Sequence, residues 1–109
     1  MNEKDEHFYL LRKIKGQPKS SQRDLAKELG ISLGKVNYIL NALKAKGLVK
    51  VKNFKKNPNK INYIYILTPK GVAEKTKLTI NFMKRKMREY DELKKELVDE
   101  KNKNKKESE

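Results

Sequence analysis

The residues best suited to recognition chemistry lie between positions 32 and 46, where amides, a phenol and lysines recur at helical spacing. The apolar residues of this segment are Val36, Ile39, Leu40 and Leu43. Their i, i+3, i+4, i+7 spacing is typical of one buried helix face. The residues left outside that face include no acid: Ser32, Gly34, Lys35, Asn37, Tyr38, Asn41 and Lys44. Because asparagine can bond an adenine edge bidentately and lysine can reach guanine or phosphate, this surface is suited to the major groove of DNA.

The charge distribution indicates a polyanionic partner. The 109 residues carry 28 Lys and Arg against 14 Asp and Glu, a formal net charge of +14. No acid occurs from Leu29 to Ala73, a stretch that contains nine lysines. A one-sided basic surface of this kind favours nucleic acid first and an anionic membrane second. The alternative, a solvated surface that serves only solubility, does not explain why acids are excluded from so long a stretch.

Two further helices are needed to position this surface. A first helix is expected over about 5–15, and a second over about 21–29, where Ser21 and Asp24 have the spacing of a capping box. Only about three residues, including a glycine, separate the second helix from the third, which is the helix-turn-helix arrangement. The residues placed to bind a phosphate at the start of the second helix are Ser21, Gln22 and Arg23.

A basic hairpin is expected after the third helix. Residues 48–52 alternate between apolar and polar, and residues 61–67 are rich in β-branched and aromatic types. The polar segment between them, residues 53–60, contains a proline turn, and we call it the wing. The hairpin residues expected to contact the DNA backbone or minor groove are Lys52, Lys55, Lys56, Asn59 and Lys60. Such contacts position a protein and make binding salt-dependent, but they read little sequence.

A long helix is expected over residues 69–100, because a capping threonine and a proline begin it and no breaker follows Gly71. Its heptad seam, with one polar position, consists of Ile80, Met83, Met87, Tyr90, Lys94 and Leu97. A domain of residues 1–68 is too short to cover this helix, so pairing with a second copy in a homodimer is expected. The alternative is a helix folded back onto the first helix. Residues 101–109 contain no apolar residue and are expected to form a disordered charged tail.

Catalysis and membrane insertion are not supported by the sequence. Cysteine is absent, which excludes disulfides and thiolate metal sites, and the single histidine, His7, is expected to be a plain surface residue. No glycine-rich phosphate loop follows a strand. The longest fully apolar stretch, Tyr63–Leu67, is far shorter than the roughly 20 residues of a membrane span, and the charged N-terminus does not resemble a signal peptide. We therefore expect a cytoplasmic protein without catalytic residues, cofactor or metal.

The wing and the start of the long helix resemble a known family. The run Tyr65-Ile66-Leu67-Thr68-Pro69-Lys70-Gly71 resembles the wing-to-helix junction of the MarR family of transcriptional regulators. The chain is most similar to a small MarR-like subgroup associated with bacterial exopolysaccharide gene clusters. The other residues that carry this similarity are Asn53-Phe54, Asn59-Lys60, Tyr63, Glu74-Lys75, Leu78-Thr79, Phe82, Arg85-Lys86 and Glu89-Tyr90.

The resemblance implies a dimer that binds pseudo-palindromic duplex DNA, with helix 32–46 in the major groove and wing 53–60 beside the backbone or minor groove. Two departures from the family pattern are evident. The wing contains only Lys and Asn where the family has an acidic–arginine cluster, which weakens the case for minor-groove reading. Only about six residues precede the first expected helix, where the family places another helix, which weakens the case for a small-molecule effector.

The sequence therefore predicts a mainly α fold with a small β-hairpin: a winged helix-turn-helix, residues 1–68, followed by a long C-terminal dimerisation helix. The expected function is that of a sequence-specific regulator that binds double-stranded DNA as a homodimer. Two alternatives remain open. A sequence-indifferent architectural DNA-binding protein would share the charge but have no preferred site, and a winged-helix adaptor for other proteins would have little affinity for DNA.

Overall fold

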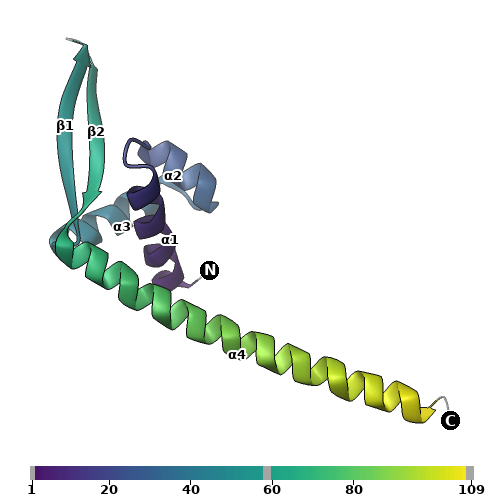
Figure 1. Ribbon diagram of the computed structural model, residues 1–109. Coiled ribbons are helices and arrows are strands. Elements are labelled where there is room, and N and C mark those ends of the chain that lie inside the picture. The colour runs from purple at the N-terminus through teal and green to yellow at the C-terminus, as the bar shows by residue number, and fades with distance from the viewer. Residues whose placement is uncertain (1, 58–59, 108–109) are drawn as a thin grey trace. The chain divides into compact units, whose positions relative to one another are not determined.

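The computed structural model describes residues 2–57 and 60–107, with side chains described for 2–53 and 63–106 (Figure 1). The elements in chain order are α1 (Glu3–Gly16), α2 (Gln22–Leu29), α3 (Leu33–Ala45), β1 (Val49–Asn57), β2 (Lys60–Leu67) and α4 (Pro69–Glu107). The predicted fold class is confirmed: three helices, an antiparallel hairpin and a long final helix. The chain forms two compact units, Met1–Leu78 and Thr79–Glu109, so the first turns of α4 belong to the unit that contains the other elements.

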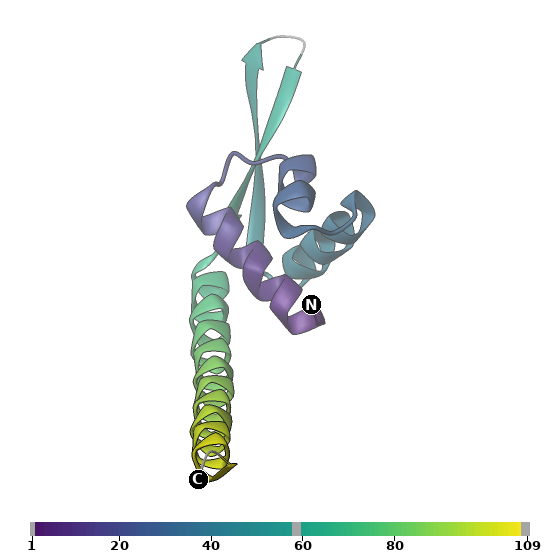
Figure 2. The same ribbon diagram turned by 90° about the vertical axis from the view of Figure 1, so that its right-hand side faces the viewer.

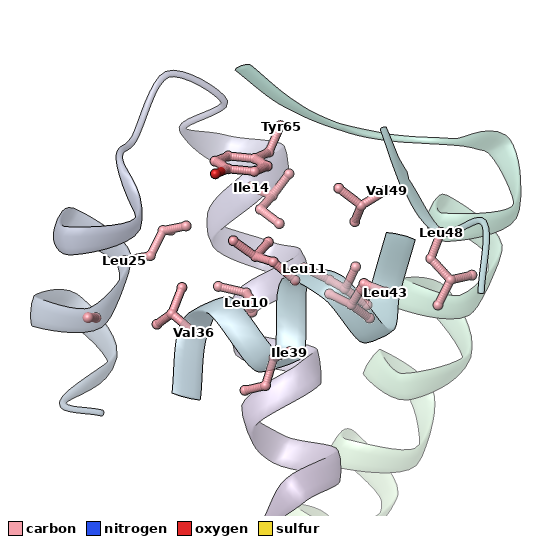
Figure 3. Close-up of a cluster of buried hydrophobic side chains, with 12 residues drawn as sticks. Leu10, Leu11, Ile14, Leu25, Val36, Ile39, Leu43, Leu48, Val49 and Tyr65 are labelled. Atoms are coloured by element: carbon pink, nitrogen blue, oxygen red, sulfur yellow. The ribbon is translucent and has the colours of Figure 1, made fainter. Parts of the chain in front are cut away.

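The core of the first unit lies where α1, α2, α3 and the base of the hairpin meet (Figure 3). The buried residues of this core are Leu10, Leu11, Ile14, Leu25, Ala26, Val36, Ile39, Leu40, Leu43, Leu48, Val49 and Tyr65. The four apolar residues predicted to form the inner face of α3 are all at most 1% exposed. That burial determines which side chains of α3 face away from the protein.

Short polar side chains begin each of the first three helices. The side chain of Asn2 accepts a hydrogen bond from the Asp5 amide and starts α1 at Glu3, slightly earlier than expected. Ser21 and Asp24 form the predicted capping box at α2, and Ser32 caps α3. Only three residues, 30–32, separate α2 from α3, and the first of them is a glycine with a left-handed backbone. These contacts confirm the helix-turn-helix spacing.

The hairpin is longer than the sequence suggested. β1 and β2 pair from Val49 opposite Leu67 out to Asn57 opposite Lys60, with an irregularity between Lys55 and Asn57. Most polar residues of β1 lie opposite apolar or aromatic residues of β2, for example Lys52 opposite Ile64, and the ladder continues into the expected loop. Figures 1 and 2 show the two strands extending away from the three helices.

A tight junction joins the hairpin to α4. The Thr68 hydroxyl donates to the carbonyl of Gly47 at 2.6 Å and accepts from the amide of Gly71 at 3.0 Å. The Thr68 amide also donates to the carbonyl of Leu48. Gly71 lies against that same Leu48 carbonyl, so closely that an added Cβ would overlap it. The Thr-Pro-Lys-Gly run is therefore explained by a close approach between two backbone segments.

α4 begins at Pro69 as predicted and continues past the expected end at residue 100 to Glu107. No proline or glycine follows Gly71, and the Lys, Asn and Glu side chains beyond residue 100 are compatible with a solvated helix. Residues 101–107 are thus helical rather than part of the disordered tail that we expected, and residues 108–109 lie outside the described residues. Among the residues that the structure describes, no helix is long and apolar enough to cross a membrane.

The junction generates a stability prediction for Gly71. We expect Gly71→Ala to lower the free energy of unfolding by about 1–3 kcal/mol, because its methyl group has to displace the Leu48 backbone. Gly34→Ala is the matched control, since a Cβ there would meet nothing within 4 Å and alanine favours a helix. Urea unfolding followed by circular dichroism measures both. Equal urea midpoints for Gly71→Ala and the unaltered protein would show that the close contact between Gly71 and the Leu48 backbone does not limit the residue at position 71.

Candidate nucleic-acid interface

The side of α3 opposite its buried residues is exposed and contains no acid. Its predicted contact residues are all exposed: Gly34, Lys35, Asn37, Tyr38, Asn41 and Lys44. Tyr38 is the most prominent, with 67% of its surface accessible. Ser32, also predicted as a contact, is used as the helix cap, because its Oγ accepts a hydrogen bond from the Lys35 amide at 3.1 Å. The outward surface of α3 therefore offers amide, phenol and ammonium groups on one rigid element.

A chain of hydrogen bonds connects the amides of this surface to the hairpin; we call it the amide relay. Asn41 Nδ2 donates to Asn37 Oδ1 at 3.1 Å, and Asn37 Nδ2 donates to Gln22 Oε1 at 3.3 Å. Gln22 Nε2 in turn donates to the Tyr65 hydroxyl at 3.0 Å. The structure thus brings together three residues predicted separately as DNA contacts. Tyr65 was not among the predicted site residues, because the sequence indicated only that it lies in the second strand of the hairpin.

The start of α2 is less open to a phosphate than predicted. The Ser21 amide donates to Asp24 Oδ2 at 3.0 Å, and Ser21 Oγ accepts from the Asp24 amide at the same distance. Hydrogen bonds from the backbone and side chain of Ser21 lower the pKa of the Asp24 carboxyl, so it stays ionised. Ser21 is thus engaged in capping, and Gln22 belongs to the amide relay. Arg23 is the exposed cation of this segment.

Lys35 has a partner within the protein. Its Nζ lies 2.7 Å from Oε1 of Glu6, a residue of α1 whose side chain is only 4% exposed. The Lys35 side chain is half exposed, so the ion pair lies at the edge of the core. A buried carboxylate requires a nearby positive charge or hydrogen-bond donors. The pair therefore ties the first turn of α3 to α1, a role that the sequence did not indicate.

The single histidine, His7, lies on α1, where most of its side chain is covered. His7 was expected at the surface, but this was wrong, because its side chain is only 14% exposed. Burial lowers the pKa of His7, Lys46 lowers it further, and the carboxylates of Glu3 and Glu6 act in the opposite direction. No group of three His, Asp or Glu residues that could hold a metal ion occurs among the described residues.

The hairpin places basic residues beyond the core. Lys52 and Asn53 are exposed on β1, and Lys52 pairs with Ile64 across the hairpin. The side chains of the other predicted hairpin contacts lie outside the described residues: Lys55, Lys56, Asn59 and Lys60. Their role as phosphate contacts stays a prediction.

The second unit consists of the remainder of α4 and exposes an apolar stripe. All five apolar residues of the predicted seam are between 48% and 65% exposed: Ile80, Met83, Met87, Tyr90 and Leu97. Two large apolar residues beside the seam, Leu93 and Val98, are similarly exposed and were not predicted. They occupy positions that flank a heptad core, and they widen its apolar surface. Lys94, the predicted polar position, is exposed as well.

Comparison with known proteins supports the helix-turn-helix assignment. Residues 10–50 match the family model described as winged helix-turn-helix DNA-binding. No curated protein matches the chain. The fold resembles that of the transcriptional regulator BldR from Sulfolobus solfataricus, with a TM-score of 0.62 and 22% identity over 76% of this chain and 59% of BldR.

Two further solved structures are similar. Staphylococcus aureus MarR, solved with salicylate and kanamycin, has a TM-score of 0.57 and 20% identity over 74% of this chain and 53% of that one. Streptococcus pneumoniae FabT, solved in complex with DNA, has a TM-score of 0.56 and 24% identity over 76% and 56%. The chain thus spans less than two thirds of the length of each. The MarR-like winged-helix fold is confirmed, whereas the exopolysaccharide-associated subgroup stays a prediction.

The Glu6–Lys35 pair generates a second stability prediction. Lys35→Met leaves the Glu6 carboxylate buried without its cation, so we expect the free energy of unfolding to fall by about 1–3 kcal/mol. Lys44→Met, an exposed lysine on the same helix, should change it by less than about 0.5 kcal/mol. Adding Glu6→Gln to Lys35→Met should restore much of the loss. Identical urea midpoints for the two lysine variants would contradict a structural role for the pair.

Proposed function

We propose that this chain is a sequence-specific regulator of transcription that binds double-stranded DNA as a homodimer on a pseudo-palindromic operator. The single observation that carries the proposal is the exposed, acid-free side of α3, which presents linked amides on a helix of helix-turn-helix type. The match of residues 10–50 to a winged helix-turn-helix DNA-binding model supports it. So does the likeness to FabT, which was solved with DNA.

In this proposal α3 enters the major groove. An α-helix fits that groove, and its side chains can then reach the base edges. Asn41 and Tyr38 are the exposed polar residues that we assign to base contacts, because asparagine can bond adenine bidentately and the phenol can donate, accept or pack against a thymine methyl. Gly34 allows the start of the helix to lie close to the DNA backbone, since no side chain intervenes.

The basic residues outside α3 are assigned to the phosphates. Arg23 on α2 and Lys52 on β1 are exposed cations of the first unit. The wing adds Lys55, Lys56, Asn59 and Lys60. Such contacts release counterions, so binding should weaken steeply with salt for every sequence. They fix the register of α3 without reading bases.

The homodimer is assigned to α4. Its apolar stripe is exposed in the single chain. Contiguous exposed apolar surface commonly marks an interface. A second copy of the same helix would cover the seam, and two copies related by a two-fold axis would present two copies of α3 to two half-sites.

The proposal is tested by selecting bound duplexes from a random DNA pool at roughly 150 mM salt. We expect an inverted repeat. Tyr38→Ala and Asn41→Ala should stay folded but lose about 1–3 kcal/mol of discrimination between that repeat and its single-base variants. Lys27→Ala, which removes a charge from α2, is the control. Any effect of this substitution should lower the affinity for all DNA sequences equally.

Other outcomes would overturn the proposal. An enriched pool without a motif, released by salt, would indicate an architectural DNA-binding protein instead. No enrichment would direct attention to protein partners. Unchanged base preference in both α3 variants would remove the assigned base contacts, even if the protein itself remained specific.

The dimer assignment has its own prediction. Met87→Lys introduces a charge into the seam and should weaken self-association by about tenfold or more. Glu92→Lys, which lies on the side of the helix away from the seam, is the control and should leave it intact. Sedimentation equilibrium measures both. The assignment is wrong if the unaltered protein sediments as a monomer, or if the two variants behave alike.

A further inference from the structure

Tyr65 lies at the inner end of the amide relay and is held from three sides. Its ring is buried in the core with 7% of the residue exposed. Its backbone amide donates to the carbonyl of Pro18, in the connection between α1 and α2, at 3.2 Å. Its oxygen, drawn in red in Figure 3, lies on the side of the core near Leu25 of α2. The hydroxyl therefore has a fixed position relative to the start of α2.

The relay has a direction, because each amide uses its nitrogen as donor and its oxygen as acceptor. The Tyr65 oxygen accepts from the nitrogen of Gln22, which turns the Gln22 oxygen towards Asn37. The Asn37 nitrogen donates to that Gln22 oxygen, and the Asn37 oxygen accepts from the Asn41 nitrogen. In this arrangement every link runs from an amide nitrogen to an oxygen, and the last oxygen belongs to Tyr65. Because a phenol hydroxyl can donate as well as accept, the buried tyrosine fixes the place of the last link rather than its direction.

The outer end of the relay is the group that matters for base reading. An amide nitrogen carries two protons, and the relay uses one of those on Asn41. The remaining proton and the Oδ1 acceptor are the pair that an adenine edge requires, a donor for N7 and an acceptor for the N6 amino group. A flipped Asn41 amide would present them in the opposite order, which does not match adenine at the same place.

We infer that Tyr65, which does not face the proposed DNA-binding side itself, is a positioning residue for base recognition: through Gln22 and Asn37 it anchors the Asn41 side chain in the place from which its amide meets a base. This inference rests on the proposed function and adds a specificity determinant from the hairpin. The two exposed links are individually weak, since hydrogen bonds in contact with water contribute little net free energy. The part-buried Gln22–Tyr65 bond gives the relay its fixed end.

The test compares Tyr65→Phe with Tyr63→Phe in the full chain. Tyr65→Phe keeps the buried ring and removes only the hydroxyl, which accepts the hydrogen bond from Gln22. We expect it to lower discrimination at the base pair read by Asn41 by about three- to tenfold, with the salt dependence and the affinity for random DNA unchanged. Tyr63, on the same strand and 52% exposed, supplies the matched control, and Tyr63→Phe should change none of these quantities.

A second variant and a second readout guard against a folding defect. Gln22→Met cuts the relay outside the core and should produce the same loss at the same base pair. In the free protein, Tyr65→Phe should shift the side-chain amide NMR signals of Gln22, Asn37 and Asn41, whereas Tyr63→Phe should not. A merely structural role of Tyr65 would lower stability without moving the Asn41 amide signals or one base preference.

The outcomes separate this inference from the proposed function. If the unaltered protein selects a motif and Tyr65→Phe selects the same motif with equal discrimination, the relay does not set base preference and the inference is wrong. The same holds if the Asn41 amide signals do not move. If the unaltered protein selects no motif, the proposed function fails first, and the inference fails with it.

Discussion

The burial of one stripe of α3 in the core that it shares with α1, α2 and the base of the hairpin is the interaction on which the rest of this structure depends. Leu10, Leu11 and Ile14 of α1 share one core with the inner residues of α3, and all of them are at most 1% exposed. Each fully buried aliphatic side chain contributes about 1.5–3 kcal/mol. Rotating α3 about its axis would expose several of these side chains to water at once, and each would lose its stabilising contribution. The same packing therefore holds the helix in place and keeps Asn37, Tyr38 and Asn41 in solvent.

The charge of the proposed DNA-binding side also depends on where the acids of this lysine-rich chain lie. In the first unit two of those acids have structural roles. Glu6 is buried beside Lys35, and Asp24 is bonded to the Ser21 amide at the start of α2. The Glu6 carboxylate forms an ion pair between α1 and α3, and the Asp24 carboxylate caps the start of α2. Lys35 is therefore compensated by Glu6, whereas the stretch from Leu29 to Ala73 contributes eight further lysines and no acid of its own.

Much of this architecture could be predicted because its causes are local. Helical spacing identified the inner face of α3, and Ser21, Ser32 and Pro69 marked helix starts through backbone chemistry that acts within one turn. The contacts that were missed join distant positions. Gln22 meets Tyr65 across 43 residues, and Glu6 meets Lys35 only because α1 crosses α3. No periodicity encodes such pairs. The hairpin length was missed because polar residues extend a strand when their partners favour it.

The junction at Thr68 has a geometric consequence. The carbonyls of Gly47 and Leu48, just after α3, are bonded to the residue that starts α4, and Gly71 leaves no room between the two segments. The end of the helix assigned to base contacts and the root of the helix assigned to pairing are therefore joined backbone to backbone. Both sides of this contact lie within the first unit, which includes α4 as far as Leu78. Because this joint is made largely by main-chain atoms, substitution of the exposed side chains of α3 leaves its contacts unchanged.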